Sequence, residues 1–122
     1  MNPVAPVPDR SETLAKTLFR AAAALGLTDT ELASIMGVDR STVRRTRQRG
    51  YLDPQTKTGE IAALVLRVYR SLYALTGGAP AAMAEWMHTG NRHVNGIPAQ
   101  RMFSLVGLAE VVAYLDGVRA KV

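Results

Sequence analysis

The sequence contains no cysteine and only two histidines, and this scarcity argues against most metal and redox chemistry. Without cysteine there is no disulfide framework and no thiolate metal site. The two histidines, His88 and His93, have only Glu85 as a nearby carboxylate, which leaves too few metal ligands. No glycine-rich phosphate loop precedes a helix, and no nucleophile lies beside a base in a recognisable pattern. We therefore predict a protein that is not an enzyme, with no catalytic residue, no metal and no cofactor.

No apolar run is long enough to cross a membrane. The longest one, from Ile61 to Leu75, is interrupted by Arg67 and Arg70. Three prolines occur in the first eight residues, but no basic segment followed by an apolar core, so this end does not resemble a signal peptide. We expect a soluble, cytoplasmic protein whose residues 1–10 form a flexible proline-rich arm.

The alternation of apolar and polar residues that is typical of strands is also missing. Apolar residues recur instead at helical spacing, and the segments end at glycines or prolines. Thr28 with Glu31 has the spacing of a capping box, Asp9 or Ser11 can cap a first helix, and Asp39 can cap another. The prediction is an all-α fold. We expect helices over residues 10–25, 29–36, 40–49, 58–76, 80–88 and 98–105, and from 107 to near the C-terminus.

The expected helix over residues 58–76 carries apolar residues on two adjoining stripes. Ile61, Val65 and Leu72 belong to one stripe, and Leu66 and Tyr73 belong to the other. An apolar surface this wide needs partners on two sides. The helix is therefore expected at the centre of the fold or in the seam of a homodimer.

The positive charge is concentrated in one short segment. The chain has a net charge of +5, and residues 1–39, 40–57 and 58–122 carry −2, +5 and +2. A localised basic stripe is typical of proteins that bind a polyanion, although a solvated charged surface is the simpler alternative.

The basic segment follows the pattern of a helix-turn-helix over residues 28–50. Ala33 is small enough for a second helix to cross it closely, and Gly37 permits the turn between the helices. Val43 provides an apolar contact that holds the second helix against the first. We predict that this second helix reads the major groove of DNA with Arg40, Ser41, Thr42, Arg44 and Arg45, and that it contacts phosphates with Arg47 and Arg49.

The stretch from Met36 to Arg45, ending in Arg49-Gly50, resembles Xre/Cro-type repressor domains, with Thr46 where these usually have an apolar residue. An ordered set of motifs in the second half resembles the C-terminal toxin-binding domain of the Xre–MbcA–ParS antitoxins. Together the two resemblances cover roughly residues 28–122. The motifs of the second half are Trp86, Asn91, Gly96-Ile97-Pro98, Leu105, Gly107, Val111-Val112, Leu115 and Val118.

The resemblance implies an antitoxin of a type II toxin–antitoxin system. Such antitoxins form dimers, repress their own operon by binding operator DNA, and block a RES-domain toxin that attacks NAD⁺ by covering its active site. On this chain the loop 91–98 and the last helix would face the toxin. Asn95 stands where relatives commonly have glycine. The candidate toxin-binding residues are Asn91, Arg92, Arg101, Arg119 and Lys121.

These expectations divide the chain into a DNA-binding region, 11–57, and a dimerisation and toxin-binding region, 58–122. Two alternatives remain open at this point. A stand-alone Xre-family repressor would share the DNA-binding region without a toxin partner. An interaction adaptor would use the arginines only for solubility. Trp86 is expected to anchor the core rather than contact a partner.

Overall fold

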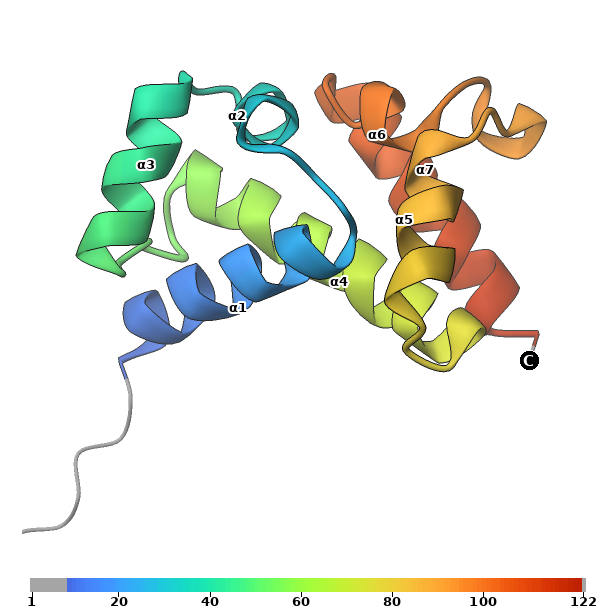
Figure 1. The fold of residues 1–122 in the computed structure, drawn as a ribbon, viewed down its shortest axis with the longest axis horizontal. Coiled ribbons are helices and arrows are strands. Elements are labelled where there is room, and N and C mark those ends of the chain that lie inside the picture. The colour runs from blue at the N-terminus through green and yellow to red at the C-terminus, as the bar shows by residue number, and fades with distance from the viewer. Residues whose placement is uncertain (1–8, 122) are drawn as a thin grey trace, which may run out of the picture.

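The computed structural model describes residues 9–121 as an all-helical protein, which confirms the predicted fold class (Figure 1). Within these residues there is no strand, and the one backbone pairing of strand type is an isolated antiparallel bridge between Asn91 and Gly96. The expected arm lies outside the described residues except for Asp9, which caps the first helix, and Arg10, which begins it. The elements are α1 (Arg10–Ala24), α2 (Asp29–Met36), α3 (Arg40–Arg49), α4 (Lys57–Thr76), α5 (Pro80–His88), the 3-10 helix η1 (Arg92–Val94), α6 (Pro98–Arg101) and α7 (Leu105–Arg119).

The N-terminal caps of the first three helices agree with the sequence. The Asp9 side chain accepts a hydrogen bond from the Ser11 amide, at 2.8 Å. Thr28 and Glu31 form both hydrogen bonds of a capping box. The Asp39 carboxylate accepts the Thr42 amide at 2.7 Å. Each cap satisfies an amide that has no partner within its own helix, so these starts are determined by residues close in sequence.

The boundary between the last two helices differs from the expectation. The helix that begins at Pro98 ends at Arg101 rather than continuing to Leu105, and α7 begins at Leu105 rather than at residue 107. The cause is Ser104, whose hydroxyl accepts the Gly107 amide at 3.0 Å and so starts a new helix. Leu105 therefore lies in the first turn of α7.

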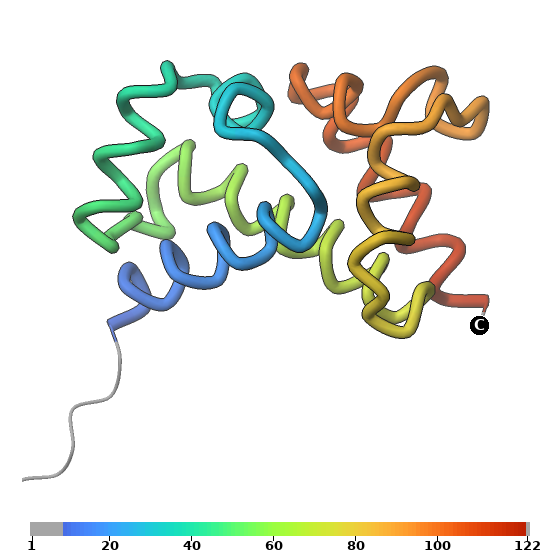
Figure 2. The backbone as a smooth tube through the Cα atoms, in the orientation of Figure 1, coloured from blue at the N-terminus to red at the C-terminus, as the bar shows by residue number. Residues whose placement is uncertain are grey.

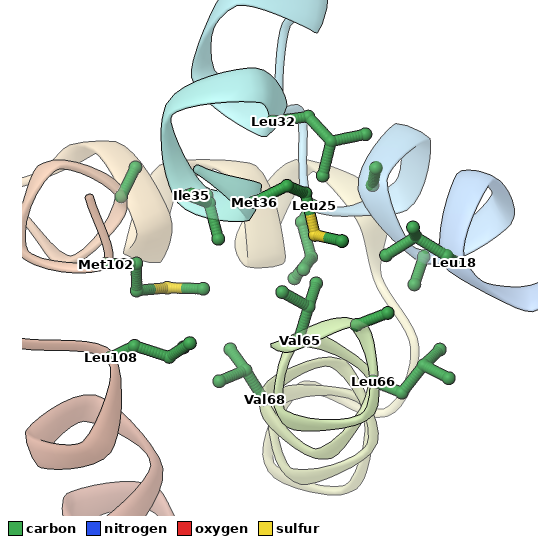
Figure 3. Packing of buried hydrophobic residues seen from close by; sticks show 14 of the residues in the cluster. Leu18, Leu25, Leu32, Ile35, Met36, Val65, Leu66, Val68, Met102 and Leu108 are labelled. Atoms are coloured by element: carbon green, nitrogen blue, oxygen red, sulfur yellow. The ribbon is translucent and has the colours of Figure 1, made fainter. Parts of the chain in front are cut away.

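Helix α4 passes through the middle of the molecule. Figure 2 shows α1, α2 and α3 toward its N-terminal end and α5 and α7 beside its C-terminal half, and α6 packs on α5 and α7. Its most extensive contacts are with α1 and α7. Val65 and Val68 are fully buried, and in Figure 3 Val65 faces Leu25 and Met36 while Val68 faces Leu108. The prediction of a central helix with partners on two sides is confirmed.

One core extends through both halves of the molecule. Leu18 and Leu32 in the first half, and Met102 and Leu115 in the second, are each at most 1% exposed and belong to the same cluster. Tyr73 is the exception to the predicted stripes of α4, since it is 51% exposed. None of the helices in the described range has the length and apolar character that crossing a membrane requires.

Replacing either of the two glycines of α7 by alanine should change the stability of the protein, in opposite directions. A Cβ on Gly107 would lie 1.8 Å from the Arg101 carbonyl oxygen, whereas a Cβ on Gly117 would meet nothing within 4 Å. Gly107→Ala should therefore lower the free energy of unfolding by about 1–3 kcal/mol or more, because the backbone must shift. Gly117→Ala should raise it by up to about 1 kcal/mol, because alanine favours the helix. Urea denaturation checks both, and equal effects would contradict the close approach at Gly107.

Candidate DNA-binding and partner-binding surfaces

Helices α2 and α3 pack against each other as a helix-turn-helix. Ala33 and Val43, the two predicted contact residues, are 4% and 3% exposed. Gly37 ends α2 with φ of 70°, a left-handed conformation that favours glycine, and the next amide, of Val38, donates to the Ala33 carbonyl at 3.0 Å. The turn therefore holds α3 at a fixed angle across α2.

The surface of α3 is almost entirely open to solvent. Val43 is its single buried residue, and Thr42 and Thr46 are half-buried. The exposed side chains include all five arginines of the helix. The complete set of exposed residues on α3 is Arg40, Ser41, Arg44, Arg45, Arg47, Gln48 and Arg49. The structure thus brings the predicted DNA-binding residues together on one helix, and all of its arginines except Arg47 are exposed without an ion-pair partner among the described residues.

Gln48 was missed by the sequence analysis. It lies four residues after Arg44 and three after Arg45, so the three side chains are neighbours on the outward face of α3. Glutamine can form a bidentate pair with adenine in the major groove. Its helical spacing from Arg44 and Arg45 is the feature of the sequence that indicates this position.

Arg47 differs from the other arginines because it has partners within the protein. Its Nη2 and Nη1 atoms donate to the two carboxylate oxygens of Asp29, at 2.6 and 3.1 Å, and its guanidinium lies 4.6 Å from the centre of the Phe19 ring. The hydrogen bonds lower the pKa of Asp29 and raise the pKa of Arg47. Arg47 therefore connects α3 to both α1 and α2.

The start of α3 is held by Asp39. Besides the Thr42 amide, its carboxylate accepts the Ser41 hydroxyl at 2.9 Å. Hydrogen bonds from Thr42 and then Ser41 lower the pKa of Asp39 to about 2. Asp39 is therefore ionised at neutral pH, and its charge lies at the helix N-terminus, where the helix dipole favours an anion. The predicted contact residues Ser41 and Thr42 thus also help to cap the helix.

The five predicted residues of the second half fall into two separate groups. Asn91, Arg92 and Arg101 surround the loop after α5, whereas Arg119 and Lys121 lie at the far end of α7. Since α7 has 15 residues and rises about 1.5 Å per residue, it is about 22 Å long. The two groups are not parts of one cluster.

Within the first group, only Arg92 is an exposed cation without a role in the fold. It lines an open cleft of about 470 Å³ with Trp86 and His93. Asn91 caps η1 by accepting the His93 amide at 2.9 Å. Arg101 turns inward, where its Nε donates to the Val94 carbonyl at 3.0 Å and its guanidinium pairs with Glu110. Arg101 therefore braces the loop.

Asn95 in this loop and Trp86 in α5 answer two questions that the sequence raised. Asn95, which stands where relatives commonly have glycine, has φ of 61°, a left-handed conformation that asparagine tolerates better than most residues. Trp86 packs against the core but remains half-buried, with part of its ring lining the cleft. The loop keeps its turn without a glycine at position 95.

A direct contact joins the helix-turn-helix to the second half. His88, at the end of α5, places its Nε2 atom 2.9 Å from the Glu31 carboxylate and its Nδ1 atom 2.8 Å from the Ala84 carbonyl oxygen. Glu31 also accepts the Thr28 amide in the capping box of α2. The end of α5 is thus held against the start of α2. Over residues 9–121 the structure does not gather three side chains of the kinds that bind metals.

Comparison with known families gives two matches that together cover nearly the whole chain. Residues 7–67 match the antitoxin Xre-like helix-turn-helix domain, which is half of the chain. Residues 71–121 match the antitoxin Xre/MbcA/ParS C-terminal toxin-binding domain. A comparison with curated proteins finds no match. The boundary between the two matches falls within α4.

The contacts of Arg47 predict that it orients α3 rather than binding a phosphate. Arg47→Met should weaken DNA binding without changing the slope of log affinity against log salt, because the number of neutralised phosphates stays the same. Its effect on stability should be no more than about 1 kcal/mol, since the ion pair is half-exposed. Exchanging the charges, with Asp29→Arg and Arg47→Asp together, should recover most of the affinity. If Arg47→Met instead lowers the salt slope by about one, and the charge-exchange variant does not recover the affinity, then Arg47 binds a phosphate.

Proposed function

This chain belongs to the antitoxins that join an Xre-like helix-turn-helix domain to an Xre/MbcA/ParS C-terminal toxin-binding domain, and we propose that it neutralises a RES-domain toxin that degrades NAD⁺ and represses its own operon. The observation that carries this proposal is the uncovered cationic face of α3, on a chain whose other half matches a toxin-binding domain. It acts by binding, without a catalytic residue, metal or cofactor of its own.

Operator DNA is bound by α3 in this proposal. Arg40, Ser41, Thr42, Arg44 and Arg45 enter the major groove, and Gln48 joins them because it shares their face. Arg49, at the end of the helix, contacts a phosphate. Arginine suits both guanine edges and phosphate oxygens, and the many positive charges supply affinity through release of counterions. Two copies of the chain bind the operator as a homodimer, since helix-turn-helix proteins usually pair on two-fold symmetric sites.

The toxin is bound by the second half of the chain. The open cleft beside α5 and the exposed polar face of α7 offer a surface for covering an active site, with Arg92, Arg119 and Lys121 as free cations among the described residues. Asn91 and Arg101 contribute by shaping the loop. We assign DNA binding to residues 11–57 and dimerisation and toxin binding to residues 58–122. Both partners of such an antitoxin are cytoplasmic, and this is where we propose that it acts.

The proposed DNA contacts predict distinct salt dependences. Arg44→Ala, which removes a proposed base contact, should weaken binding to the promoter fragment of the operon, and Arg49→Ala, which removes the proposed phosphate contact, should also lower the slope of log affinity against log salt by about 0.9. Gln48→Ala should instead reduce the preference for the operator over unrelated DNA. Arg119→Ala, an exposed arginine on α7, is the matched control and should change neither quantity. Titration of labelled DNA at several salt concentrations measures all four.

Co-expression with the product of the neighbouring gene tests the toxin partner. That product alone should stop growth and deplete cellular NAD⁺, and the antitoxin should restore both and co-purify with it in a fixed ratio. A stand-alone repressor, the alternative, predicts DNA binding with no complex and no protection. If the product stops growth while the NAD⁺ content stays unchanged, the antitoxin function stands but the toxin is not of the RES class.

A further inference from the structure

An uncovered apolar corner joins α6 to α7. Phe103, Leu105 and Val106 are 42%, 66% and 69% exposed, and they are three of the five large hydrophobic side chains exposed within residues 9–121. The other two, Tyr51 and Tyr73, are far from them in sequence, and each has a polar hydroxyl group. The 103–106 corner is thus a small apolar patch that is exposed to solvent. Such patches often mark a binding surface.

Folding of α7 does not require these apolar side chains. Leu105 and Val106 occupy the first two positions of the helix, where the helix dipole favours acidic residues. The neighbouring Met102 and Leu108 supply the buried contacts, at 0% and 1% exposure, and Ser104 supplies the cap. Neither Leu105 nor Val106 belongs to the core or packs against it. Among the described residues, no intramolecular contact therefore accounts for their apolar character.

The corner is held rigidly by the backbone around it. Gly107 packs so closely on the Arg101 carbonyl that no side chain fits between them. Arg101 in turn donates to the Val94 carbonyl and pairs with Glu110, which neutralises the charges beside the corner. A preorganised surface loses little conformational entropy on binding. The surface that fits this corner is an apolar hollow on another protein, rather than a charged one.

We propose that the 103–106 corner is the hydrophobic anchor through which this antitoxin binds its toxin. This inference rests on the proposed function, since the corner lies within the match to the toxin-binding domain, 71–121. Three side chains cover much less than the roughly 1,200 Å² that a stable interface buries, so they cannot hold a second copy of the chain by themselves. Toward the toxin they are the centre of a wider contact. The hydrogen bond from Arg101 to the Val94 carbonyl connects the corner to the loop 91–96.

The test replaces the two most exposed side chains with Leu105→Glu and Val106→Glu together. Glutamate suits the first turn of a helix, so the melting temperature and operator binding should be retained. The amount of antitoxin that co-purifies with the tagged product of the neighbouring gene should fall about tenfold or more, as expected when anchor residues are removed. Protection of growth should disappear with it. Tyr51→Glu, which alters a similarly exposed apolar side chain outside the matched toxin-binding segment, should leave both unchanged.

The outcomes separate this inference from the proposed function. If the unaltered chain forms no complex with the neighbouring product, the proposed function fails. If it forms one and the double glutamate variant binds equally well, the function stands and the anchor is rejected. A variant that loses dimerisation in light scattering while keeping the toxin would assign the corner to a second copy, which also rejects the anchor. Should the glutamates unfold the protein, Leu105→Ser with Val106→Ser provides the same comparison.

Discussion

The burial of α4 on two sides is the constraint on which the rest of the structure depends. Val65, Val68 and Leu72 are at most 1% exposed because α1 covers one side of the helix and α7 covers the other. Neither half of the molecule has an apolar core of its own that excludes α4. The helix that carries the arginines proposed to bind DNA and the loop beside the open cleft are therefore placed relative to each other by a shared core.

This arrangement allows α3 to contribute almost nothing to the core. With Val43 as its single buried residue, α3 keeps its surface for cations and relies on local contacts for its position. Asp39 caps its start, Gly50 ends it, and the Arg47–Asp29 pair ties it to α2. The carboxylates at positions 29 and 39 also offset part of the repulsion among five arginines on ten residues. Most of the side chains proposed to contact DNA are thus free of a structural role in α3, and Ser41 and Thr42 are the exceptions because they take part in its cap.

The contact between His88 and Glu31 gives the two halves a second connection besides α4. It joins the end of α5, next to the open cleft, to the capping box that begins α2. Gly26, in the turn between α1 and α2, lies so close to Ala84 that an added Cβ would approach within 2.8 Å. These contacts hold α5 against the turn and the capping box that begin α2.

The sequence by itself determined the helices, most of their ends and the outward cationic face of α3, because caps and helical spacing act over three or four residues. Thr28 with Glu31, Asp39 and Gly37 act in this way, and Ser104, which starts α7, is a local cap of the same kind. The tertiary structure alone decided which arginines are free. Arg47 meets Asp29 across 18 residues, and Arg101 meets Val94 and Glu110 only after α6 and α7 have packed. An arginine has the same sequence signature whether it faces water or a carboxylate, since its partner is chosen by the placement of helices that the local pattern does not encode.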